Sequence, residues 1–249
     1  PYTIGTTDEW NDFVASVASG TNYSGRIVKL TNDITVTETV GRRDNKPFSG
    51  TFLGGGHTIT ANISSTTTGT GSNEQGVAPF HYISGATIKN LKVAGTIASA
   101  SYHTAGLVGF ADGTNLIEGC AVSATLNVSS NYAGGIIGHG LSSATTIRGC
   151  AFAGTINGVG EDRENIGGIW GWSDSGTPTL EDCLEAGTYT NIASMHPMGL
   201  QSNKGTITNC YYMNAQVGSP RNACTVSGAA QVYAEISDNA ITMSTSQQL

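Results

Sequence analysis

The residues that could do chemistry gather late in the chain. Three carboxylates, Asp174, Glu181 and Glu185, follow one another closely. Glycoside hydrolysis needs two carboxylates about 5–9.5 Å apart across one bond. Cleavage of acidic polysaccharides by elimination needs a base and a cation to neutralise charge. No cluster of Arg and Lys accompanies these carboxylates, so a polysaccharide lyase or glycoside hydrolase is our alternative hypothesis.

Aromatic residues in the same stretch suggest binding. Trp170 and Trp172 are two of the three tryptophans, and an exposed indole offers sugar rings an apolar face for stacking. Packing of both indoles in the core is the competing interpretation. The candidate ligand-binding residues are Trp170, Trp172, Asp174, Glu185 and His139. We predict no catalytic residue, no cofactor and no metal ligand, because the cysteines lack accompanying His or CxxC spacing.

These residues must be positioned by a repeating scaffold. A four-residue segment recurs that begins with Ile or Leu, has Asn, Gly or Asp third, and ends with Leu or Cys: Ile88–Leu91, Ile117–Cys120, Ile147–Cys150, Leu180–Cys183 and Ile207–Cys210. Its cysteines are 30, 33 and 27 residues apart, a period typical of a solenoid. The third position carries the residues that best tolerate positive φ, so we expect a tight corner there.

Beyond each corner the pattern has period two. Val93, Val122 and Phe152 form an inward column, while Thr96, Thr125 and Thr155 should face outward. Strands that bend at a shared corner and stack on their equivalents form a parallel β-helix. Parallel crossovers are almost always right-handed. The predicted fold is therefore all-β, a single-stranded right-handed parallel β-helix (solenoid) with a short N-terminal α-helical cap.

A second motif precedes the first in each unit. Its central copies are Gly106-Leu107-Val108-Gly109, Gly135-Ile136-Ile137-Gly138 and Gly168-Ile169-Trp170-Gly171, with degraded copies around Val77 and Met198. This resembles the GLUG motif of bacterial cell-surface and adhesin-like proteins. The resemblance covers roughly residues 48–213. It implies a surface β-helix and carries no catalytic motif to this chain.

The ends of the stack need protection. Thr6 and Glu9 read as a capping box, and Trp10, Phe13 and Val17 follow at helical spacing. We expect one domain over residues 1–249: a helical cap at 1–25, coils at 26–213 with GLUG-like repeats from about 75, and a C-terminal coil or cap at 214–249. Two loops, 64–73 and 158–165, should leave the solenoid.

Three further columns carry predictions. Cys120, Cys150, Cys183 and Cys210 should be buried, stacked and reduced, because stacked strands hold Cβ atoms too far apart for disulfides. The state of Cys224 stays open. Lys89, Glu118, Arg148 and Glu181 should form an outer ladder of alternating charge. Glu185 falls in an inward apolar column, so either a local bulge turns it outward, which we favour, or it lies in a functional pocket.

Composition restricts the partners. Only 12% of the residues are charged, the net charge is −7, and Lys and Arg together number 11. This argues against nucleic acid and against anionic membrane surfaces, and no apolar run is long enough for membrane insertion. We expect an extracellular, secreted or cell-surface module that is monomeric by itself and belongs to a larger multidomain protein.

The favoured function is therefore an adhesin-like binding or scaffold module that recognises a carbohydrate or host-surface ligand. Ice binding by the outward threonine column is a third hypothesis. It is weak, because a flat ice-binding plane needs several such columns.

Overall fold

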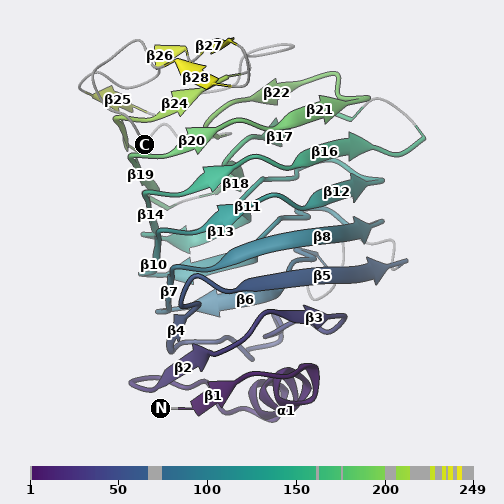
Figure 1. Ribbon diagram of the computed structural model, residues 1–249, viewed down its shortest axis with the longest axis vertical. Helices are drawn as coiled ribbons and strands as arrows, with labels where there is room; N and C mark the ends of the chain where they lie inside the picture. Colours follow the sequence, from purple (N-terminus) through teal and green to yellow (C-terminus); the bar gives the residue numbers. More distant parts are fainter. Residues whose placement is uncertain are drawn as a thin grey trace.

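The chain folds as a parallel β-solenoid closed at its N-terminal end by one helix (Figure 1). The computed structural model describes residues 2–66, 75–160, 163–174, 176–199 and 206–213. It also describes the backbone of four short strands, at 225–227, 232–233, 235–237 and 240–242. Cys224, most of 214–249, residues 67–73 of the first predicted loop and 161–162 of the second lie outside the described residues.

Three parallel sheets form the walls. Sheet A stacks the strands that end at the corners, in the order β1 (Tyr2–Ile4), β2 (Ile27–Leu30), β4 (Thr51–Leu53), β7 (Thr87–Lys89), β10 (Leu116–Glu118), β14 (Thr146–Arg148), β19 (Thr179–Glu181), β23 (Thr206–Thr208) and β25 (Thr225–Ser227). Sheet C stacks β6 (Phe80–Ser84), β9 (Val108–Gly113), β13 (Ile137–Ser143) and β18 (Trp170–Ser173).

Sheet B is built from the strands after each corner. Its members are β3 (Ile34–Val36), β5 (Thr58–Ser65), β8 (Lys92–Ser99), β11 (Ala121–Val122), β12 (Thr125–Val128), β15 (Ala151–Phe152), β16 (Thr155–Gly158), β20 (Leu184–Glu185), β21 (Thr188–Thr190), β24 (Tyr211–Tyr212) and β26 (Val232–Tyr233). Two small pairs complete the described strands: β17 (Ile166–Gly167) with β22 (Met195–His196), and antiparallel β27 (Glu235–Ser237) with β28 (Ala240–Thr242).

The direction of coiling is visible in Figure 1. Sheet B strands cross the front from left to right, sheet C strands return behind them, and the chain climbs from the N-terminal end. This is a right-handed coil. The fold class expected from the repeats is confirmed, and the proposed domain boundaries stay a prediction.

The corners have the backbone conformation that the repeat predicts. Asn90, Gly119, Gly149, Asp182 and Asn209 all have φ between 50° and 63°. Each lies between a sheet A strand and a sheet B strand, so the chain turns there in every coil. The first and fourth residues of each four-residue segment, from Ile88 to Cys210, are buried. The left-handed corner therefore points both flanking apolar residues into the core.

The cysteine and charge columns lie as expected. Cys120, Cys150, Cys183 and Cys210 are buried free thiols. On the outside of sheet A, Lys89 Nζ lies 2.9 Å from Glu118 Oε1, and Arg148 contacts Glu118 at 3.2 Å and Glu181 at 2.7 Å. Both the reduced cysteine column and the alternating ladder are thus confirmed.

Helix α1 (Thr7–Ala18) closes the N-terminal end of the core. The Thr6 hydroxyl accepts from the Glu9 amide at 3.2 Å, and the Glu9 carboxylate accepts from the Gly5 amide at 2.7 Å. Trp10, Phe13 and Val17 are buried against the first coils. The capping box and the helical cap are both confirmed.

Candidate functional site

Sheet C carries a second layer on its outer side. The covering segments, 75–79, 101–105 and 130–134, run across this sheet and hydrogen-bond to one another, for example from the Gly76 amide to the Tyr102 carbonyl and from the Gly134 amide to the Thr104 carbonyl. The second glycine of each motif allows the backbone of a covering segment to pack directly against the sheet C strand. A Cβ on Gly138 would overlap the His103 carbonyl oxygen, and one on Gly109 would overlap that of Gly76. The glycines are therefore required for backbone-to-backbone packing.

The two tryptophans of this sheet lie in different environments. Trp170, aligned with Val108 and Ile137, is 2% exposed and belongs to the main core. Trp172 is aligned with His139 and Phe110 and is only partly buried. Residues two apart in a regular strand would share a face, so the strand turns between them. Trp170 is thus a core residue, as in the competing interpretation, and it presents no exposed indole face to a ligand.

Asp174 ties the outer column together. Its Oδ1 accepts from Trp172 Nε1 at 2.6 Å, and its Oδ2 lies 3.0 Å from His139 Nε2. The Asp174 side chain is 49% exposed, whereas that of His139 is 9% exposed. Three of the five residues predicted for binding, His139, Trp172 and Asp174, therefore meet at one place on the surface.

The ring of His139 is held under this carboxylate. Because a carboxylate can only accept, His139 donates from Nε2, which leaves Nδ1 as the acceptor of the neutral ring. Nδ1 is buried without a hydrogen-bond partner, and so is Nδ1 of His103, whose ring centroid lies 4.2 Å from that of His139. Burial lowers the pKa of His139, opposed by the Asp174 charge, and lowers the pKa of His103 to about 2.

A cation lies at the other end of the column. The Arg43 guanidinium carbon is 4.0 Å from the centroid of the Phe110 ring, a cation–π contact. Burial lowers the pKa of Arg43, and the charges of Asp174 and Asp112 oppose that shift. Phe110, His139 and Trp172 therefore form an aromatic strip on sheet C, with Arg43 at one end and Asp174 at the other.

Tyrosines of the covering segments extend the aromatic surface. The Tyr132 ring lies 4.7 Å from Trp172, edge to face, and 5.5 Å from Tyr102. His103 and Tyr132 both have positive φ, at 63° and 65°. This conformation is unfavourable for such side chains and is often found at functional sites.

These extra residues carry only a weak signal in the sequence. His103 and Tyr132 each lie three residues before the first motif glycine, Gly106 or Gly135. That shared position marks them as equivalent residues of successive units. Nothing local indicated that they would lie over the strip, because the contact depends on how the covering segments cross sheet C.

Glu185 and Glu181 are not part of this site. Glu185 is fully buried inside the solenoid, where its Oε1 accepts from the Gly187 amide and the Tyr189 hydroxyl, each at 2.8 Å. It pairs in register with Phe152 and Tyr212, so the outward bulge that we favoured is wrong. The partners inside the core, rather than a turn of the backbone, accommodate the carboxylate. Glu181 lies in the sheet A ladder.

The three carboxylates therefore lie in three different places. Asp174 is on the outer face of sheet C, Glu181 is on the outer face of sheet A, and Glu185 is inside the solenoid. These three carboxylates do not flank a common substrate bond. The described residues also contain no group of three or more His, Cys, Asp or Glu side chains suited to a metal ion. In the described part of the chain no helix is long and apolar enough to cross a membrane.

Comparison with known proteins supports the architecture. No protein-family model matches this chain, and no curated protein matches it. A similar solved structure is that of a Bacteroides ovatus protein described, provisionally, as an immunoglobulin A1 protease. The TM-score is 0.57 at 15% sequence identity, and the match covers 99% of this chain and 80% of that one. At this identity the likeness shows the fold alone, and the GLUG resemblance rests on the repeat residues themselves.

Proposed function

We propose that this protein is an extracellular, adhesin-like binding module that recognises a glycan through the outer face of sheet C. The observation that carries the proposal is the placement of Trp172. Its indole is partly exposed, fixed by Asp174 and flanked by Tyr132. Rigid aromatic faces beside a carboxylate suit sugars, which combine apolar ring faces with hydroxyl donors.

The polar groups around Trp172 fit this ligand class. Each carboxylate oxygen of Asp174 can accept more than one hydrogen bond, so both retain capacity for sugar hydroxyls after contacting Trp172 and His139. At the same place, the Nδ1 atoms of His103 and His139 are buried without hydrogen-bond partners, and each unsatisfied buried acceptor lowers the stability of the folded protein. Local conflicts of this kind are expected at functional sites.

The fold and composition fit a surface or secreted location. A solenoid shared with a bacterial protein described in connection with immunoglobulin A1 suits a protein that meets host molecules. We expect a shallow site, weak binding to a single glycan, and stronger attachment when several copies are displayed together. The carbohydrate-active alternative loses its residue set, since its three carboxylates lie apart.

Tryptophan fluorescence tests the proposal directly. Trp10 and Trp170 are buried, so a ligand that binds at the protein surface and stacks on an indole should change mainly the emission of Trp172. A glycan array should identify ligands of the intact chain. Titration with those ligands should then shift the emission of the wild type.

Three variants sharpen the test. Trp172→Ala should abolish array binding while the protein stays folded, Asp174→Asn should weaken it, and Val159→Ala, at an exposed apolar residue elsewhere, should leave it unchanged. Glycan binding that survives Trp172→Ala would refute the proposal. So would unfolding of that variant, because the indole would then be a structural residue.

A further inference from the structure

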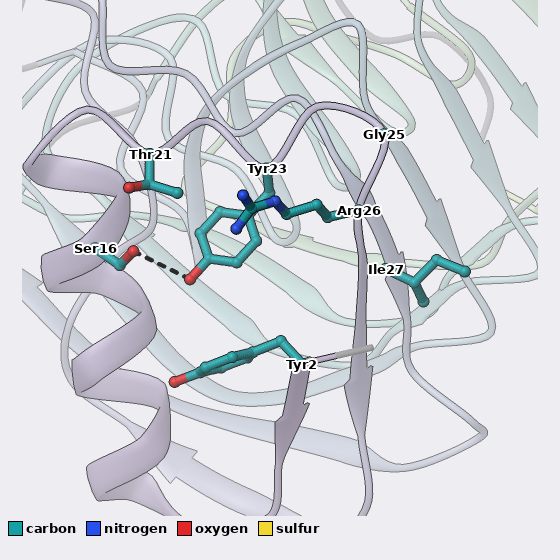
Figure 2. A pocket seen from close by; sticks show the side chains of 7 residues that line it. All are labelled: Tyr2, Ser16, Thr21, Tyr23, Gly25, Arg26 and Ile27. Carbon is teal, nitrogen blue, oxygen red and sulfur yellow. Dashed lines mark hydrogen bonds between the residues drawn. The ribbon is translucent and has the colours of Figure 1, made fainter.

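A second candidate site lies near the N-terminal end of the solenoid. It is an open pocket of about 650 Å³ between α1 and the start of β2, lined by Tyr2, Ser16, Thr21, Tyr23, Gly25, Arg26 and Ile27 (Figure 2). None of these residues belongs to the sheet C site. A ligand of this pocket would therefore bind independently of the proposed glycan surface.

Two large apolar side chains in the wall of the pocket, Tyr2 and Ile27, are unusually exposed. Tyr2 is 36% exposed and Ile27 is 42% exposed. They are two of the three large hydrophobic side chains that stand exposed in the described part of the chain. The Tyr2 and Tyr23 rings lie 6.0 Å apart, edge to face. Exposed apolar side chains that lie next to one another mark a binding surface more often than isolated ones do.

The backbone behind the pocket is fixed in advance. Tyr23 has φ of 61° and Gly25 of 72°, and the Arg26 amide donates to the Tyr23 carbonyl at 2.9 Å, which closes a tight turn. The Arg26 carbonyl accepts from the Thr51 amide of the next coil at 2.9 Å. The Tyr23 hydroxyl is also held, 3.1 Å from Ser16 Oγ (Figure 2). A ligand would therefore meet walls that are already ordered.

Arg26 is the charged side chain among the residues that line the pocket. Figure 2 shows the Arg26 side chain extending back toward Tyr23. No carboxylate among the described residues forms an ion pair with Arg26. Outside the pocket lining, the charges of Asp12 and Glu9 act on the Tyr2 hydroxyl. Glu9 itself is engaged by the Gly5 amide and the Thr6 hydroxyl at the helix N-terminus.

We propose that this pocket binds a carboxylated sugar residue, such as a uronic or sialic acid unit of an acidic glycan. The sugar ring lies against Tyr2 and Ile27, and its carboxylate pairs with Arg26, away from Asp12 and Glu9. The hydroxyls of Ser16 and Thr21 exchange hydrogen bonds with the ring hydroxyls. The Arg26 cation beside the apolar side chains of Tyr2 and Ile27, in a chain of net charge −7, selects acidic over neutral sugars.

The experiment uses the full chain with labelled isoleucine methyl groups. Glucuronic acid should shift the Ile27 methyl resonance saturably, and glucose should bind about tenfold more weakly, as expected for loss of one exposed charge-assisted hydrogen bond. N-acetylneuraminic acid, titrated in parallel, distinguishes the two sources of carboxylated sugar.

Variants separate the sugar site from general charge effects. Arg26→Gln should weaken glucuronic acid binding about tenfold and leave glucose binding unchanged, whereas Lys29→Gln, at an exposed cation of β2 that does not line the pocket, should change neither. Tyr2→Ala should weaken both sugars. Trp172→Ala should leave this site intact, so the outcome here is independent of the sheet C proposal.

Three results would overturn the assignment. One is an Ile27 resonance that does not respond to either acidic sugar. Another is an equal effect of Arg26→Gln and Lys29→Gln, which would indicate a diffuse electrostatic effect. The third is an acidic tetrapeptide that binds as tightly as glucuronic acid, which would make the pocket a peptide site. Arg26 is exposed, so its variant tests the proposal even if Tyr2→Ala fails to fold.

Discussion

Glu185 offers a stringent test of how the solenoid interior is held together. Its carboxylate is fully buried and accepts from the Gly187 amide and the Tyr189 hydroxyl. Glu185→Ala removes that acceptor and leaves both donors behind. An unsatisfied buried donor costs about 1–3 kcal/mol, so two donors predict a loss of about 2–6 kcal/mol in the free energy of unfolding.

The loss is large enough to measure by thermal or urea unfolding. A change of 1 kcal/mol shifts the melting temperature by about 2–4 °C in chains of 150–250 residues, so a loss near the middle of the range predicts a shift of roughly 10 °C. Glu185→Gln is the matched control. Its amide oxygen can still accept from both donors, and it should melt much closer to the wild type.

Tyr189 tells whether the hydrogen bonds are responsible. If they are, Glu185→Ala should cost less in a Tyr189→Phe background, because one of the stranded donors is already gone. Strictly additive effects, or a Glu185→Ala variant within about 0.5 kcal/mol of wild type, would refute the reasoning.

The same pair predicts an alkaline effect. Burial raises the pKa of Tyr189, and the charge of Glu185 raises it further. Since the folded-state pKa lies above the unfolded value near 10, the contribution of Tyr189 to stability is present below about pH 10 and is lost as the pH rises above it. Tyr189→Phe should remove this part of the alkaline slope.

Two further predictions concern the outer faces. Glu118→Lys should lower the melting temperature more than Glu118→Gln, because it places three cations in successive coils beside Lys89 and Arg148; the difference should shrink in high salt, and equal melting temperatures would contradict the ladder. Burial lowers the pKa of His81 to about 4, with help from the charges of Arg42 and Arg43, and burial beside His139 lowers the pKa of His103 to about 2. Both folded values lie below the unfolded value near 6.5, so stability should fall as the pH drops below about 6.5, by up to about 1.4 kcal/mol per pH unit for each histidine. His103→Phe should flatten that slope in urea unfolding between pH 7 and pH 4, and an unchanged slope would exclude His103 as its source.

The predictable part of the site had a local signal. His139, Trp172 and Asp174 were identifiable because they depart from the small or apolar residues of equivalent positions. Tyr132 and His103 were not identifiable. They belong to the covering segments and contact strip residues about one coil away, and the path of those segments is not specified by any single repeat. Arg43 comes from still further away and meets Phe110 only because an early loop crosses the same face.

The sequence by itself determined the architecture. Period two decides which side chains face inward, and the short list of residues that tolerate positive φ decides where each coil turns, from Asn90 to Asn209. Both are properties of a few neighbouring residues, repeated along the chain. For this reason the cysteine column and the charge ladder could be predicted from the repeat spacing alone.

Only the tertiary structure decided the faces of Trp170, Trp172 and Glu185. The strand turns between the two tryptophans beside a glycine that receives the covering segments, so one indole enters the core and the other lies outside. Glu185 stays inside because Tyr189 and Gly187 supply donors there. Alternation along a strand says nothing of such partners, because a buried charge depends on what the fold brings around it.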